Sequence, residues 1–280
     1  MLAIKQLVYP EGLEQALTRL SNDRNLRICA GGTDLLPAIR DGRLTGQSLL
    51  MLSPLREELS GVTREADSLV IGALTLHEQI KESPLIRELI PPLATACGLV
   101  GSTQIRNRAS LGGNILNASP AADSVPILLA AGAEAELRSA QAVRRIPLDQ
   151  VALGPGRNCL EPDELLIAIH IPIPAGGWHG GYFKAGNRNA LTISIAGAAT
   201  LYNPAIGWRV ALGSVGPKIS RAPLLEAAFN GGGNLTRQEL GQLLRQEARP
   251  IDDVRASAEY RLRVLTNALF TAYEQRRQVR

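Results

Sequence analysis

The most informative part of the sequence is the polar segment Gly101-Ser-Thr-Gln-Ile-Arg-Asn-Arg-Ala-Ser-Leu-Gly-Gly-Asn-Ile-Leu-Asn-Ala-Ser-Pro-Ala-Ala-Asp123. Its 23 residues carry many hydrogen-bonding side chains and three glycines, and an apolar run over residues 125–131 follows it. A merely connecting loop of that length is uncommon in a compact domain and is more often functional. The polar atoms suit a ligand with many hydroxyls and phosphates, and an elaborate structural loop is the alternative interpretation.

A second glycine-containing segment, Ala30-Gly-Gly-Thr-Asp34, lies further upstream. The apolar run before it, residues 26–30, is typical of a buried strand, and residues 33–40 favour a helix start. Glycines at such a turn let backbone N–H groups approach a phosphate closely. A sharp strand-to-helix turn also needs glycines, so this segment alone leaves both interpretations open. The chain contains neither a Walker motif nor G-x-G-x-x-G.

Hydrophobic patterning predicts a mixed α+β protein. Residues 11–20 place Leu13, Ala16, Leu17 and Leu20 on one helical stripe, and residues 48–53 indicate a strand. Further along, strands are expected at 69–72, 135–138 and 165–171. Helices are expected from Thr75 toward Ile86, over 93–100 after a break at Pro91-Pro92, and over 125–131.

The clearest boundary signal is Pro172-Ile-Pro174 followed by Gly176-Gly177. Beyond it, residues 181–186, 192–202 and 208–214 predict a three-stranded antiparallel meander, with a hairpin turn at 203–207. Three helices are expected after the meander, and the last is amphipathic. We therefore expect three units, at residues 1–55, 56–174 and 175–280.

Composition narrows the classes of function. The chain has 280 residues, 4% of them aromatic, and a formal net charge of +4. Because a nucleic-acid surface needs clustered cations with aromatics between them, we interpret the C-terminal arginines as solvated helix faces instead. These are Arg237, Arg245, Arg261, Arg276 and Arg277. The longest apolar stretch, residues 125–133, is too short for a membrane span.

Cysteine usage excludes metal chemistry carried by this chain alone. The three cysteines, Cys29, Cys97 and Cys159, include no C-x-x-C pair, so neither a zinc site nor an iron–sulfur cluster is expected. An odd, sparse set fits a reducing compartment, and we expect a cytoplasmic protein. No carboxylate or cysteine pattern near the histidines suggests a shared site, and His170 is expected to point outward from a strand. No catalytic residue and no metal ligand are predicted.

The two glycine segments together resemble the FAD-binding subunits of molybdenum hydroxylases, the family that includes xanthine dehydrogenase. The similar residues are Ala30-Gly-Gly-Thr-Asp-Leu35, Gln104-Ile-Arg-Asn-Arg-Ala-Ser-Leu-Gly-Gly-Asn114 and Ala118-Ser-Pro-Ala-Ala-Asp123. Ile169-His-Ile-Pro172, Tyr182-Phe-Lys184, Ala211-Leu-Gly-Ser-Val-Gly-Pro217 and Glu259-Tyr-Arg261 also look like the family. The resemblance implies a vanillyl-alcohol-oxidase-like FAD-binding domain of two α/β subdomains, followed by a C-terminal domain with a three-stranded antiparallel sheet and a helical bundle.

The resemblance also implies which residues hold FAD, without a covalent bond. In such a fold the first segment binds the diphosphate, and the second wraps the diphosphate, ribityl and flavin portions. Leu166 and Lys184 fall close to the isoalloxazine ring. The residues expected at the cofactor are Ile28, Cys29, Ala30, Gly31, Gly32, Thr33, Asp34, Leu35, Gly101, Ala109, Ser110, Gly113, Asn114, Leu116, Asn117, Asp123, Leu166 and Lys184.

The function implied is electron transfer within a heterotrimer. A large partner subunit would carry molybdopterin, a small one iron–sulfur clusters, and this chain would pass electrons from them to NAD or another acceptor. Two alternatives are a free-standing flavoenzyme of the same fold that oxidises its own substrate, and a FAD-free scaffold protein. Lys184 is open between a cation that tunes the flavin and a surface lysine. Asp123 is open between a FAD contact and a helix cap.

Overall fold

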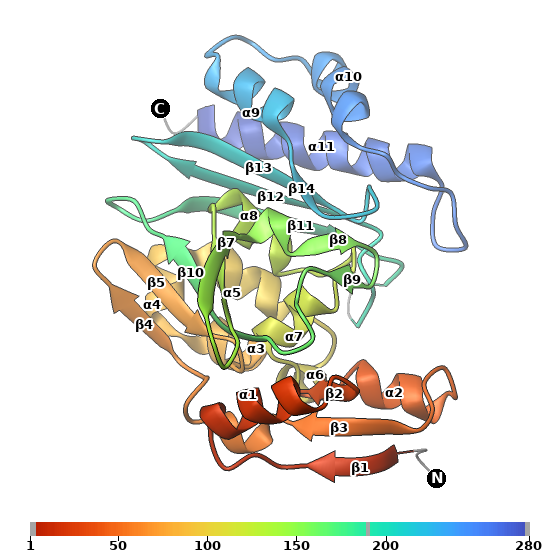
Figure 1. The fold of residues 1–280 in the computed structure, drawn as a ribbon. Helices are drawn as coiled ribbons and strands as arrows, with labels where there is room; N and C mark the ends of the chain where they lie inside the picture. The colour runs from red at the N-terminus through yellow and green to blue at the C-terminus, as the bar shows by residue number, and fades with distance from the viewer. Residues whose placement is uncertain (1–3, 189–190, 278–280) are drawn as a thin grey trace.

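The computed structural model describes residues 4–188 and 191–277, and it arranges them in three stacked layers (Figure 1). A three-stranded sheet lies at the N-terminal end, a five-stranded sheet in the middle and a four-stranded sheet beneath the C-terminal helices. Each sheet uses strands from one part of the chain only. The boundaries at residues 55 and 174 stay predictions.

The N-terminal layer is a small parallel α/β unit. Its strands are β1 (Ile4–Val8), β2 (Leu26–Cys29) and β3 (Gln47–Met51), in the order β1-β3-β2. Helix α1 (Leu13–Asn22) buries the predicted apolar stripe, and α2 (Leu35–Arg40) follows β2. A short 3-10 helix, η1 (Ser53–Leu55), follows β3. The patterning missed β1, because most of its residues are exposed and show no alternation.

The middle layer is an antiparallel sheet with helices packed into one large apolar core. The strands are β4 (Val62–Glu65), β5 (Ser68–Gly72), β10 (Leu165–Pro172), β6 (Glu134–Arg138) and β7 (Val143–Pro147), in that spatial order. The helices are α3 (His77–Glu82), α4 (Pro84–Leu89), α5 (Pro91–Gly98) and α8 (Val125–Ala130). A 3-10 turn, η2 (Leu148–Gln150), and a small hairpin of β8 (Ala152–Gly154) and β9 (Arg157–Asn158) complete the layer.

The polar segment is not the continuous loop that the sequence suggested. It folds into two short helices, α6 (Thr103–Arg106) and α7 (Leu111–Leu116). The hydroxyl oxygen of Ser102 accepts a hydrogen bond from Ile105 N, and Ser110 Oγ accepts one from Gly113 N. Such side-chain caps stabilise the start of a helix that is too short to show a hydrophobic periodicity in the sequence.

Prolines begin helices in the middle layer, where we expected them only to break the chain. The expected helix over 75–86 ends at Glu82, and α4 then starts with Pro84. Pro91 and Pro92 form the first turn of α5 rather than preceding it. A proline is tolerated in a first turn because the amide that it lacks has no partner there.

The C-terminal layer has four strands instead of the three expected. These are β11 (His179–Ala185), β12 (Ala196–Asn203), β13 (Gly207–Gly213) and β14 (Ser220–Arg221), joined in that order. The hairpin at 203–207 is confirmed by the pairing of β12 with β13. Strand β14 has two residues, too few for a hydrophobic pattern to reveal it.

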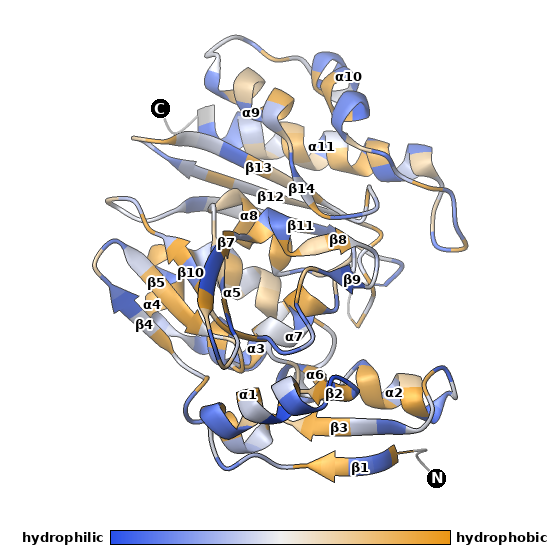
Figure 2. Cartoon of the chain, viewed as in Figure 1, coloured by the Kyte–Doolittle hydropathy of each residue, from blue (hydrophilic) through white to orange (hydrophobic). Residues whose placement is uncertain are grey.

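The four-stranded sheet is covered on both faces. Helices α9 (Pro223–Asn230), α10 (Arg237–Glu247) and α11 (Ala258–Arg277) lie on one side (Figure 1). Helices α5 and α8 contact the sheet from the middle layer, and Figure 2 shows α8 as a mainly apolar helix beneath it. Every residue of β12 is buried as a result. This packing brings the end of α5 and the residues before α8 against strand β11.

Two polar residues are buried where the sequence predicted exposure. His170 lies in the central strand β10 and is 8% exposed, because Glu136 of the adjacent strand covers it with Oε2 at 2.7 Å from its Nε2. Arg261 is 2% exposed within the C-terminal layer, so it does not belong to a solvated helix face. Among the described residues, no helix is both long and apolar enough to cross a membrane.

Candidate functional site

The two glycine segments meet at backbone level. A Cβ atom on Gly31 would lie 2.0 Å from the carbonyl oxygen of Arg108, so only glycine permits this approach. Asn117 at the end of α7 donates from Nδ2 to Asp34 Oδ1 at 3.4 Å, which links the same two segments. The residues around Gly31 and Ser110 line a small pocket, together with Ala30, Leu52, Ser53, Arg56, Leu74 and Arg108.

The first segment presents backbone amides that no protein acceptor uses. Within the described parts of the chain, the N–H groups of residues 31–34 donate no hydrogen bond to backbone or side chain. Gly31, Gly32 and Thr33 are partly exposed and Asp34 is exposed, in a loop between β2 and α2. Buried and half-buried backbone donors in proteins are nearly always paired, so a run of free ones is a surface suited to an anion.

Gly32 has the backbone conformation that this loop requires. Its φ is +73°, in the left-handed region that favours glycine, and an added Cβ would lie 2.8 Å from Leu36 Cδ1. The residues before the loop support it from inside. Ile28 packs against the core around α1, and Cys29 is buried in a small cluster with Ile39 and Leu49.

The second segment uses its own amides within the protein. Leu111 N donates to Thr75 O, Gly112 N to Ala73 O, Gly113 N to Ser110 Oγ, and Asn114 and Asn117 N to carbonyls one turn back. This segment can therefore offer a ligand mainly side chains. One of them, Asn114, is already engaged, because its Oδ1 accepts a hydrogen bond from Ser124 Oγ at 2.8 Å.

Asp123 ends the polar segment in a buried ion pair. Its Oδ2 lies 2.6 Å from Lys184 Nζ, and both side chains are 7% exposed. Lys184 also donates to the carbonyl oxygen of Leu99 at 2.9 Å, at the end of α5. The phenol of Tyr182 donates to Asp123 Oδ1 at 2.9 Å. Asp123 is not a helix cap, because α8 has Ser124 at that position and no side-chain cap hydrogen bond.

Burial controls the protonation of this cluster. It raises the pKa of Asp123 above its usual value, and the neighbouring Lys184 ammonium opposes that change. Burial also raises the pKa of Tyr182 well above its ordinary value, reinforced by the adjacent Asp123 carboxylate. The phenol therefore stays protonated and serves as a hydrogen-bond donor, and the lysine charge is balanced by a carboxylate.

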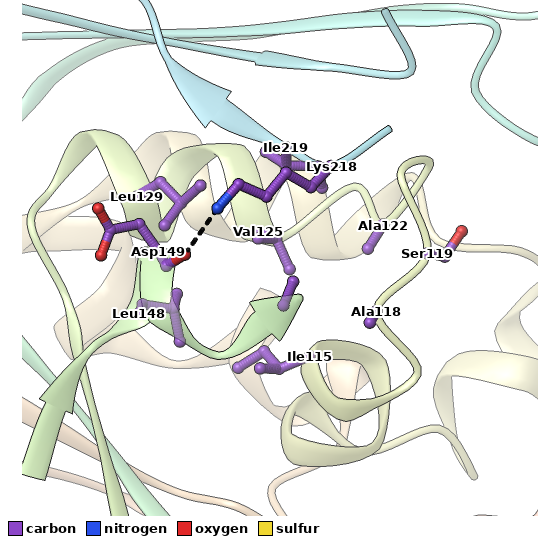
Figure 3. A pocket seen from close by; sticks show the side chains of 11 residues that line it. Ile115, Ala118, Ser119, Ala122, Val125, Leu129, Leu148, Asp149, Lys218 and Ile219 are labelled. Carbon is purple, nitrogen blue, oxygen red and sulfur yellow. Dashed lines mark hydrogen bonds between the residues drawn. The ribbon is translucent and has the colours of Figure 1, made fainter. Parts of the chain in front are cut away.

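A separate apolar depression lies on another side of the same segment (Figure 3). Lys218 extends across it and donates to the carbonyl oxygen of Asp149 at 3.4 Å. The walls are apolar side chains, namely Ile115, Ala118, Ala122, Val125, Leu129, Leu148, Ala152 and Ile219. One ammonium and apolar walls lack the many donors that a diphosphate needs, so this depression is a poorer anion site than the first loop.

The residues expected at the cofactor fall into two groups. One group belongs to the two segments that meet at Gly31, namely Ala30, Gly31, Gly32, Thr33, Asp34, Leu35, Ala109, Ser110, Gly113, Asn114, Leu116 and Asn117, of which Leu35 and Leu116 pack against the hydrophobic cores. The second group is the Asp123–Lys184 pair, with Gly101 just beyond Leu99. Leu166 is 4% exposed within the main core, on strand β10, which contacts helix α7 of the second segment. Their contacts with FAD stay predictions.

Tyr182 is the member of the cluster that sequence reasoning did not assign. It stands two residues before Lys184 on β11, and alternate residues of a strand point to the same face. The two-residue alternation of a strand, applied from Lys184, could therefore have identified Tyr182 from the sequence. The carbonyl of Leu99 could not be found in this way, because it meets Lys184 only through the packing of α5 on β11.

Comparisons with known proteins agree with this architecture. Residues 3–174 match the family model described as the FAD binding domain in molybdopterin dehydrogenase, and residues 181–276 match the CO dehydrogenase flavoprotein C-terminal domain. A xanthine dehydrogenase FAD-binding subunit from Escherichia coli O157:H7 is 33% identical over 262 residues, covering 90% of this chain and 89% of that protein. The carbon monoxide dehydrogenase medium chain of Hydrogenophaga pseudoflava is 28% identical, with 90% of each chain covered.

Solved structures of similar proteins have the same fold. Carbon monoxide dehydrogenase from Hydrogenophaga pseudoflava superposes with a TM-score of 0.90 at 26% identity, covering 98% of this chain and 97% of that one. Fold and loops thus define a flavoprotein subunit of an oxidoreductase. The chain belongs to the family of FAD-binding medium subunits of molybdenum hydroxylases, which includes the xanthine and carbon monoxide dehydrogenases.

Proposed function

We propose that this chain is the electron-transfer subunit of a cytoplasmic, heterotrimeric molybdenum hydroxylase. A large partner would hold molybdopterin and a small partner iron–sulfur clusters, and FAD on this chain would be bound without a covalent link. Bound FAD would supply the redox chemistry between the partner's clusters and NAD or another acceptor. The substrate pocket would then lie on another polypeptide.

The observation that carries this proposal is the run of free amides over residues 31–34. They lie where Gly31, which has no Cβ atom, approaches the second segment closely. An anionic diphosphate there can accept hydrogen bonds from several N–H groups at once. Gly31 and Gly32 would hold the diphosphate by backbone atoms, with Thr33 and Asp34 beside them. Asn117 would fix the first loop against the second through its hydrogen bond to Asp34.

The second group of residues would serve the flavin end of the cofactor. Asp123, Tyr182 and Lys184 form one hydrogen-bonded unit, in which each ionisable group is already paired. Both oxygens of this carboxylate already accept a hydrogen bond, and the ammonium and the phenol both stabilise its ionised form, so Asp123 does not present a free carboxylate to a substrate. This pairing favours a site that passes electrons over one that removes protons from an organic substrate.

The test compares the chain alone with the chain in its complex. The purified chain is expected to retain FAD, seen as flavin absorption near ~450 nm. Co-expression with the two partner subunits should give a complex that reduces NAD or another acceptor. A complex that forms without flavin, or a chain that oxidises substrate on its own, would contradict the proposal, and the second result would favour the free-standing enzyme.

A further inference from the structure

Arg261 of helix α11 joins three segments of the C-terminal layer. Its Nη1 donates to the carbonyl oxygen of Ile195 at 2.5 Å and to that of Ser214 at 3.3 Å, and Nη2 donates to Asp253 Oδ1 at 2.7 Å. These partners stand just before β12, just after β13 and in the connection between α10 and α11. The start of β12 and the end of β13 lie at the same end of the sheet, because the two strands are antiparallel and Gly197 pairs with Gly213.

The turn at Ser214 links the Arg261 guanidinium to the polar segment through hydrogen bonds. Its backbone N–H donates to the carbonyl of Pro120 at 2.8 Å, three residues before Asp123. Ser214 has a φ of +61°, a conformation that a residue with a side chain rarely adopts. Such a backbone persists only where surrounding contacts hold it, and the bond from Arg261 is one of these contacts.

A second connection runs through Ser194. The hydroxyl of Ser214 donates to the carbonyl of Ser194 at 3.0 Å, and Ser194 is 2% exposed. A Cβ on Gly197 would lie 2.9 Å from the Tyr182 hydroxyl and 3.3 Å from Ser194 Oγ, so the two hydroxyls flank the same glycine. Tyr182 in turn donates to Asp123. One connection from Arg261 therefore ends at Pro120, three residues before Asp123, and the other ends beside Tyr182, which donates to Asp123.

We propose that Arg261 is a positioning residue for the flavin end of the cofactor site. It fixes the Ser214 turn and the entry to β12, and these fix the Pro120 carbonyl and the surroundings of Tyr182 and Asp123. This inference rests on the proposed FAD site. Arginine suits the task because its rigid planar fork reaches two carbonyls and a carboxylate together, whereas a lysine ammonium offers one donor centre.

The experiment measures FAD binding and flavin absorption in the assembled complex, with apo-protein unfolding as a separate readout. Arg261→Lys is expected to weaken FAD binding about tenfold or more, because charge-assisted hydrogen bonds are lost. The flavin bands should also shift. Arg263→Lys is the matched control, since Arg263 lies on the same helix, is exposed and stacks on Tyr260. It should bind FAD as the wild type does.

A second variant covers the case in which Arg261→Lys does not fold. Ser214→Ala removes the hydroxyl that donates to the carbonyls of Ser194 and Pro120, and it should weaken FAD binding and shift the bands in the same direction. Wild-type affinity and spectrum in the folded variants would overturn the role of Arg261 and leave it a stabilising residue. Absence of FAD from the wild-type complex would instead overturn the proposed function, so the two failures are distinguishable.

Discussion

Lys184 and Asp123 form a buried ion pair with their charged atoms 2.6 Å apart, although 61 residues separate them in the chain. The sequence suggested an isolated lysine beside the flavin, with a net positive charge. The structure gives instead a neutral pair whose members also bind Leu99 and Tyr182. The consequence is that either residue, changed alone, leaves a buried charge without its partner.

The ion pair leads to a prediction about stability. Lys184→Met should lower the free energy of unfolding of the apo-chain by about 3–5 kcal/mol, because a buried carboxylate loses its counter-ion. The double variant Lys184→Met/Asp123→Asn should be more stable than Lys184→Met, since it removes both charges. Chemical denaturation of the four chains gives the coupling energy. Additive effects of the two substitutions would show that the pair contributes no coupling.

The flavin midpoint potential gives a second prediction from the same pair. Asp123→Asn should raise the potential, because an unbalanced ammonium favours the reduced, anionic flavin. Lys184→Met should lower it by a smaller amount, because burial already raises the pKa of Asp123 and protonation offsets the lost charge. Spectroelectrochemical titration of the flavin measures both values.

The control for the potential is Lys218→Met, a lysine outside the Asp123 cluster that contacts Asp149. It should leave the potential unchanged. Electron transfer to a dye that acts upstream of FAD should stay normal in every variant. Equal potentials in the wild type, Asp123→Asn and Lys184→Met would place the pair away from the flavin.

The first glycine loop gives a third prediction. Gly32→Val should abolish FAD retention and also lower the stability of the chain by about 1–3 kcal/mol, because valine is strained at a positive φ. Gly42→Val is the matched control. Gly42 has the same φ of +73° but no atom within 4 Å of an added Cβ, so it reports backbone strain alone. If Gly42→Val lost FAD equally, strain rather than the loop would explain the result.

His77 gives a fourth prediction, about acid stability. Burial and the nearby Arg106 lower its pKa from 6.5 to about 4 in the folded chain. The unfolded chain therefore binds a proton at a higher pH than the folded chain does. The free energy of unfolding is highest, as far as His77 is concerned, above pH 6.5. It decreases as the pH falls toward 4, by about 3 kcal/mol in total, because the unfolded chain then gains a proton that the folded chain does not.

Removing the imidazole should remove that part of the pH dependence. His77→Gln is expected to lose less stability than the wild type between pH 7 and pH 4.5, measured by urea denaturation at each pH. His179→Gln serves as control, because His179 is exposed on β11. Identical pH profiles for the wild type and His77→Gln would exclude His77 as the source.

Local patterns in the sequence predicted much of the architecture. The apolar stripe of α1, strands β2, β3, β5, β6 and β10, and the β12–β13 hairpin follow from hydrophobic spacing and turn residues within short windows. The first glycine loop was also placed correctly between a strand and a helix. Helices α6 and α7 were missed because they have only four and six residues, too few for an apolar periodicity to show in the sequence.

The sequence by itself determined that a glycine turn joins a strand to a helix at Gly31 and Gly32, since only glycine allows the close backbone approach and the positive φ found there. Only the tertiary structure decided how the charged residues pair. His170 is buried by a neighbouring strand, Lys184 is neutralised by Asp123, and Arg261 binds a carbonyl 66 residues away. The physical reason is that periodicity reports which face of an element is apolar, whereas a buried charge is stabilised by a partner that only the packing of distant segments supplies.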